Sequence, residues 1–282
     1  MKLAKFYPLA AIACATLWAL SAVAWPDVRW TGAGGDGLWV TGQNWENLRI
    51  GGYGPPGSDD ADVQIPGGFT VTIRDVDSVT FGENTTYPTL FGPEWGSVLN
   101  IYGSLSIKWY VAPVGAVDNP SVINMYANSY YSGEGIALGH NWWWNGGPGV
   151  VLNMYGDPTT EPAFVDINWM WWGGKIYLHG GILSIRGGVT ANTVDAVSDS
   201  TRLIDIREGW LILPSGFENT VSDWISRGII KAYGGGGTLV VTSLDDFPGR
   251  TAVIALVPEP SVIGLFGLAG LIGALYLRGR SR

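Results

Sequence analysis

Six short segments of the chain repeat one pattern, and this repetition limits the possible folds more than any other feature. They read LNIYG at 99–103, INMYA at 123–127, LNMYG at 152–156, IYLHG at 176–180, IDIRE at 204–208 and IKAYG at 230–234. Neighbouring segments follow one another at similar distances along the chain, with small differences that insertions would explain. A nearly constant period that tolerates insertions is typical of the coils of a β-solenoid.

The alternation within each segment predicts which side chains face the interior, because successive side chains of a strand point to opposite sides. The first and third positions are apolar and should point inward: Leu99, Ile101, Ile123, Met125, Leu152, Met154, Ile176, Leu178, Ile204, Ile206, Ile230 and Ala232. The second and fourth positions should point outward: Asn100, Asn124, Asn153, Tyr177, Asp205 and Lys231, then Tyr102, Tyr126, Tyr155, His179, Arg207 and Tyr233.

We therefore expect an all-β, single-stranded β-solenoid over residues 25–257, in the form of a right-handed parallel β-helix. The alternative is a β-sandwich of alternating strands, which requires no fixed period. No stretch of this body has a convincing amphipathic helical period, so we predict no helix there.

The stretch at 30–73 precedes the repeats and has a W...G.W....NW...P...D.A pattern. It resembles the first coil of surface and autotransporter-like β-solenoid proteins. The resemblance implies that residues 25–73 form an N-terminal cap, with Trp30, Trp39 and Trp45 closing the end of the hydrophobic column.

The N-terminus has the charge order of a secretory signal peptide. A basic start is followed by an apolar run at 9–20 and by small residues at Ala22 and Ala24. This order predicts a signal peptide at 1–24, cleaved after Ala24. A lipoprotein signal at Cys14 is the alternative. Cys14 is the only cysteine, so its removal leaves no thiol chemistry in the mature protein.

The C-terminus contains a second hydrophobic stretch, at 261–277, with no charged residue. As a helix, this stretch is just long enough to cross a hydrocarbon core of ~30 Å. Arg278, Arg280 and Arg282 follow it, so the positive-inside bias predicts a cytoplasmic end. A retained membrane anchor is one interpretation.

A more specific interpretation comes from the residues before this span. Pro258, Glu259 and Pro260 are followed by Ser261, a short glycine-rich span and the arginines. This order resembles the PEP-CTERM sorting signal of exopolysaccharide-producing Gram-negative bacteria. The resemblance implies that an exosortase recognises residues 258–282 and removes the tail. The protein would then be anchored transiently in the inner membrane before it reaches the cell surface or the extracellular matrix.

The body between these two signals is strongly acidic. Residues 25–257 hold 11 basic and 23 acidic residues, a net charge of −12. Such a surface repels phosphates and anionic lipid, so we expect no nucleic-acid partner. His140 and His179 are the only histidines, so we expect no zinc site. Asp59, Asp60 and Asp62 could bind Ca²⁺ through oxygen ligands, but their spacing is not that of an EF-hand.

No catalytic constellation is evident, and we predict no catalytic residue, no metal and no cofactor. Asp205, Arg207 and Glu208 form the only local group of charges that suggests acid–base chemistry. We interpret them as solvated charges on an outward face. A polysaccharide lyase or glycosidase would require Asp166, Asp205 and Glu208 to meet in one groove.

Two tryptophan-rich segments are the most unusual feature, NWWWN at 141–145 and NWMWW at 168–172. They supply Trp142, Trp143, Trp144, Trp169, Trp171 and Trp172, which could pack against the body or present ring faces to sugars. The separation of Trp142 and Trp169 along the chain is close to the repeat period, so we expect the two clusters to stack one coil apart as an aromatic shelf.

These features together predict an exported structural or adhesive protein that contacts exopolysaccharide. A carbohydrate-active enzyme is the first alternative. The second is a sheath or filament subunit, because a solenoid without a polar C-terminal cap can stack end to end.

Overall fold

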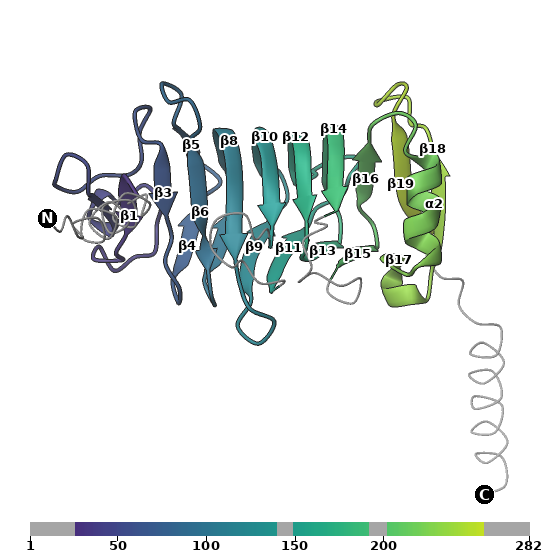
Figure 1. The fold of residues 1–282 in the computed structure, drawn as a ribbon, viewed down its shortest axis with the longest axis horizontal. Helices are drawn as coiled ribbons and strands as arrows, with labels where there is room; N and C mark the ends of the chain where they lie inside the picture. The colour runs from purple at the N-terminus through teal and green to yellow at the C-terminus, as the bar shows by residue number, and fades with distance from the viewer. Residues whose placement is uncertain (1–25, 140–148, 192–201, 257–282) are drawn as a thin grey trace, which may run out of the picture.

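The computed structural model describes residues 26–139, 149–191 and 202–256, which form the elongated body in Figure 1. The predicted signal peptide, the sorting tail with its span at 261–277, and Trp142, Trp143 and Trp144 lie outside the described residues. Within the described ranges, no helix has the length and apolar character needed to cross a bilayer.

One sheet of the body is entirely parallel and has seven strands, in the order β17-β15-β13-β11-β9-β7-β4. Their bounds are β4 (Thr70–Ile73), β7 (Val98–Ile101), β9 (Ser121–Met125), β11 (Val150–Met154), β13 (Lys175–Leu178), β15 (Leu203–Ile206) and β17 (Ile230–Ala232). The six repeat segments pair in the predicted register. Leu99 lies beside Ile123, for example, and Ile123 lies beside Leu152.

The other sheet has twelve strands, in the order β18-β19-β16-β14-β12-β10-β8-β6-β3-β1-β2, with β5 also paired to β8. Their bounds are β1 (Val28–Trp30), β2 (Trp45–Asn47), β3 (Asp62–Gln64), β5 (Ser78–Phe81), β6 (Thr89–Glu94), β8 (Ser104–Val114), β10 (Tyr130–Leu138), β12 (Phe164–Trp172), β14 (Ile182–Ala191), β16 (Trp210–Leu213), β18 (Thr238–Thr242) and β19 (Thr251–Leu256). Its antiparallel pairs are found at the two ends, where β2 joins β1 and where β19 joins β16 and β18.

From β7 to β17 the chain alternates regularly between the two sheets, so each strand from β7 to β15 pairs with the strand two places further along the chain. The fold is therefore mostly β with parallel sheets. The sandwich alternative is wrong for the described residues, because sandwich sheets are antiparallel.

The core lies between the two sheets, and the predicted alternation accounts for it. All twelve residues expected to point inward are 3% exposed or less. Burial of one such aliphatic side chain stabilises the fold by about 1.5–3 kcal/mol relative to exposure. The repeated strands thus build one continuous apolar column along the body.

At the N-terminal end of this column, Trp30, Trp39 and Trp45 are buried together, as predicted. The ring centroids of Trp30 and Trp45 are 4.8 Å apart, and those of Trp39 and Trp45 are 4.7 Å apart. The indole N–H of Trp45 donates to the carbonyl of Trp39 at 2.6 Å. A 3-10 turn, η1 (Gly42–Asn44), leads into this cluster.

The opposite end differs from the prediction. A helix, α2 (Glu218–Ser226), buries Val221 and Trp224 against the column, so the prediction of no amphipathic helix is wrong. A second 3-10 turn, η2 (Tyr233–Gly235), follows β17. Together with the antiparallel strands β18 and β19, α2 covers the C-terminal end of the column (Figure 1).

Candidate binding surface

The second tryptophan cluster lies on β12, and its side chains divide between the two faces of the sheet. Trp169 is 38% exposed and Trp171 is partly exposed on the outer face. Trp172 is only 1% exposed, and its indole N–H donates to the carbonyl of Gly174 at 2.9 Å. Trp172 therefore belongs to the core and presents no face to a ligand, because alternate residues of a strand point inward.

The strand register gives the neighbours of the second cluster only. Trp169 lies beside Gly135 of β10 and Gly188 of β14. Trp142, Trp143 and Trp144 lie outside the described residues, so the stacking of the two clusters stays a prediction. Paired residues of β10 and β12, such as Tyr130 and Phe164, are further apart along the chain than the repeat period, because a long insertion separates these strands. A chain separation close to the repeat period therefore does not by itself identify paired positions on β10 and β12.

Other aromatic side chains accompany Trp169 and Trp171 on this face. The ring centroid of Tyr110 on β8 lies 4.6 Å from that of Trp171, and Trp109 lies 4.4 Å from Tyr110. Tyr87 extends the series, with its centroid 4.9 Å from that of Trp109. We call these five side chains the aromatic patch. The sequence did not reveal Tyr87, Trp109 and Tyr110 as members, because the register of β8 was unknown.

Polar groups lie within the aromatic patch. The amide of Asn168 donates to the Oε1 atom of Glu134 at 2.9 Å. Burial raises the pKa of the Tyr110 hydroxyl to about 12, and the charge of Glu134 adds to this rise. The carboxylate thus lies close enough to Tyr110 to affect its ionisation.

The outer face of the seven-stranded sheet has two regular rows, at the predicted outward positions. Asn153 donates to Asn124 and Asn124 donates to Asn100, each at 2.9 Å. Beside this asparagine ladder, the rings of Tyr102, Tyr126, Tyr155 and His179 stack with centroids 4.0, 5.3 and 5.0 Å apart. Burial, together with the nearby Arg207, lowers the pKa of His179. Both rows link successive strands, so they form structural ladders.

The acids proposed for acid–base chemistry lie on different sheets. Asp166 on β12 accepts from Ser184 at 2.9 Å and pairs with Arg186 at 3.5 Å. Asp205 on β15 is buried, and it accepts from the backbone N–H of Gly234 at 2.7 Å. The interpretation of Asp205 as a solvated charge is therefore wrong, because the turn at η2 covers it. Glu208 is exposed.

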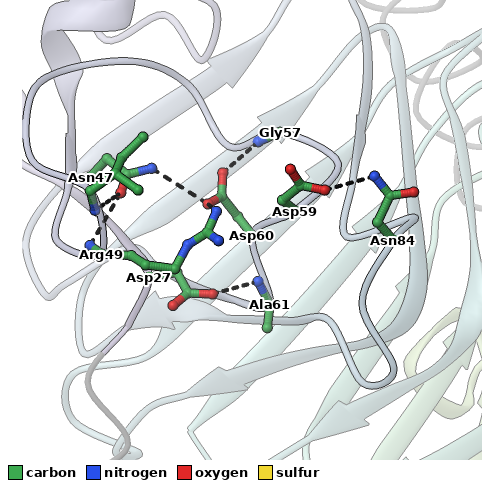
Figure 2. A network of polar contacts seen from close by, with 9 residues as sticks. Asp27, Asn47, Arg49, Gly57, Asp59, Asp60, Ala61 and Asn84 are labelled. Carbon is green, nitrogen blue, oxygen red and sulfur yellow. Dashed lines mark hydrogen bonds and ion pairs between the residues drawn. The ribbon is translucent and has the colours of Figure 1, made fainter.

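The loop acids near the N-terminus take part in a polar network (Figure 2). The buried Asp60 accepts from the N–H of Gly57 at 2.7 Å and from the Arg49 guanidinium at 3.1 Å. Asp59 accepts from Asn84 at 2.7 Å. Among the described residues, no three or more His, Cys, Asp or Glu side chains are grouped to hold a metal ion. Asp60 thus already has partners within the protein.

The chain matches a protein family described as the PEP-CTERM protein-sorting motif, over residues 256–281. No curated protein and no solved structure matches the chain. The match agrees with the signal predicted at 258–282, and it includes Pro258, Glu259, Pro260, Arg278 and Arg280, whereas Arg282 lies one residue beyond it.

Proposed function

From the PEP-CTERM sorting motif that this chain carries, we propose that the protein is a structural or adhesive component of the cell surface or the extracellular matrix. The motif is the recognition signal of exosortases, and it indicates an exported protein that is processed at the membrane. This sorting motif is the observation that carries the proposal.

The architecture of the body supports a structural role. We interpret the regular alternation between two parallel sheets as a β-solenoid, whose crossovers are right-handed as in nearly all such connections. Its core is continuous, and its outer asparagine and tyrosine rows link one coil to the next. Such a body is a rigid, elongated scaffold that can present side chains at fixed intervals. We propose that exopolysaccharide is one partner it contacts.

Neither alternative gains support from the described residues. A polysaccharide-degrading site would need Asp166, Asp205 and Glu208 in one groove, whereas Asp166 and Asp205 lie on different sheets. A filament formed by continued parallel coils would need open ends, whereas antiparallel strands and α2 occupy them.

The experiment that tests the proposal alters the sorting motif. Cells carrying Pro258→Ala, Glu259→Ala and Pro260→Ala together should retain the protein in the inner membrane, whereas the wild type should reach the surface or matrix fraction. Mass spectrometry of the wild-type surface fraction should yield peptides that start at Trp25 and none that cover 263–282. The matched control changes Asp245 and Asp246 to alanine in an exposed loop and should sort normally. Identical fractionation of the motif variant and the wild type would refute the proposal.

A further inference from the structure

We propose that the aromatic patch binds a neutral polysaccharide chain that lies across strands β8, β10, β12 and β14. This inference rests on the proposed function and specifies the ligand class and the site. The four strands are neighbours in the twelve-stranded sheet, and they stand side by side in Figure 1. A chain that crosses them would follow the long axis of the body.

Glycines separate the large rings along the row that crosses these strands. Tyr110 of β8 pairs with Gly135 of β10. Gly135 pairs in turn with Trp169 of β12, and Trp169 pairs with Gly188 of β14. Large and small side chains therefore alternate on the outer face. Without a Cβ atom, each glycine leaves space for the ring of the residue beside it.

The ring positions show that this space is used. A Cβ atom added to Gly188 would lie 2.7, 3.2 and 3.4 Å from three carbons of the six-membered ring of Trp169. A Cβ atom added to Gly135 would lie 2.6 Å from the Cε1 atom of Tyr110. Both rings thus lie over glycine backbone. The Trp169 ring also remains 38% exposed, so it offers surface to a ligand.

A sugar ring requires apolar surface for its C–H groups and polar partners for its hydroxyls, and the patch provides both. Glu134 and Asn168 hydrogen-bond to each other, and each keeps further capacity for a hydroxyl group. The Glu134 carboxylate and the net charge of −12 of the body both repel acidic polymers. The charge of the site therefore favours a neutral chain over a uronic-acid polymer.

The test measures glycan affinity of the full-length chain, purified in a non-ionic detergent, by native electrophoresis in gels containing a soluble polysaccharide. The neutral probes are a β-1,3-glucan, a β-1,4-glucan and a galactomannan, and the acidic probe is polygalacturonate. At least one neutral probe should retard the wild type, and polygalacturonate should not.

Two substitutions address the patch, and one addresses a matched position outside it. Trp169→Ala should weaken binding at least about tenfold, as expected for an aromatic residue at the centre of a contact. Gly188→Val should weaken binding comparably, because the valine side chain would occupy the space of the Trp169 ring and displace that ring. Trp95→Ala removes a tryptophan that is 43% exposed in the turn after β6, and it should bind like the wild type. Circular dichroism spectra of all three should match that of the wild type.

A fourth variant tests the basis of ligand choice. Glu134→Gln keeps an acceptor for Asn168 and removes the charge, so it should retain the neutral probe and gain measurable binding to polygalacturonate.

Three results would overturn the inference. The first is that the wild type binds no neutral probe, and the second is that Trp169→Ala and Trp95→Ala bind the neutral probe with equal affinity. The third is that the wild type sediments as a dimer and Trp169→Ala as a monomer, which would identify the patch as an interface between copies of the chain. None of them would change the location of the protein in cells, so the proposed function would fail only through the sorting-motif experiment.

Discussion

At the scale of single residues, the ionisation of the Asp62 carboxyl group says most about how the stability of the fold depends on pH. Burial raises the pKa of its carboxyl from 3.8 to about 6, and the neighbouring charge of Asp27 adds to the rise. The folded protein thus favours protonated Asp62. The stability that this group contributes is complete below pH 3.8 and is lost as the pH rises through about 6.

We therefore expect Asp62→Asn to flatten the pH dependence of the thermal midpoint. The neutral amide cannot ionise, so the difference between variant and wild type should grow in favour of the variant from about pH 4 to pH 7. Scanning calorimetry at several pH values measures this difference. The exposed Asp75→Asn serves as the control. A variant whose midpoint follows the wild-type curve in parallel would contradict the assignment.

The inward and outward positions of the repeat should differ sharply in their tolerance of substitution. Ile204→Asp would bury an unpaired carboxylate and should prevent folding of the neighbouring strands. Ile204→Val should fold and lose about 0.5–1.5 kcal/mol in the free energy of unfolding. Tyr102→Ser, at the exposed end of the stacked row, should fold normally. Denaturant unfolding of the three variants tests the register, and an Ile204→Asp variant that is as stable as Tyr102→Ser would contradict it.

At the scale of strands and helices, the asparagine ladder links three strands through two hydrogen bonds. Asn124 takes part in both bonds, since it donates to Asn100 and accepts from Asn153. Asn124→Ala should therefore cost more stability than Asn100→Ala, which breaks only one bond. We expect about 1–2 kcal/mol for the central residue and about half that for the end residue. Urea unfolding gives both values, and equal losses would mean that the ladder contributes little.

The pairing of the strands could be predicted from the sequence only in part. Each repeat segment carries its own inward and outward pattern, so the register of six strands in the seven-stranded sheet followed from the repeat alone. The pairing of Trp169 could not be predicted in this way. Strands β10 and β12 are separated by an insertion that lengthens the pairing distance beyond the repeat period, and the register shifts where β10 meets β8 and where β12 meets β14.

The helix α2 was missed for a different reason. It has nine residues, and only Val221, Trp224 and Ile225 supply its apolar side. A helix this short gives a weak periodic signal, and tertiary packing supplies most of its stability. Trp224 shows this, because its ring lies 5.5 Å from that of Trp172 in the core. Sequence periodicity therefore described the repeated middle of the protein better than its ends.

At the scale of the whole molecule, the body is a one-dimensional stack closed at both ends. Between β7 and β17 each strand pairs only with the strands of the adjacent turns, so the effect of a local defect should decline with distance along the stack. The tryptophan cluster closes one end and α2 closes the other. Removal of the tryptophan cluster or of α2 should therefore expose the strands nearest to that end to solvent first.

Trp224→Ala tests this behaviour. Removing a buried tryptophan from a core costs about 3–5 kcal/mol, and here the loss falls on the contact of α2 with Trp172 and Phe217. Hydrogen exchange of the variant should show reduced protection in α2 and in β15 to β19, while β7, β9 and β11 keep wild-type protection. A matched change at the exposed Trp95, Trp95→Ala, should leave both regions protected. A uniform loss of protection along the chain would instead mean that the body unfolds as a single cooperative unit, and that its coils are coupled beyond their nearest neighbours.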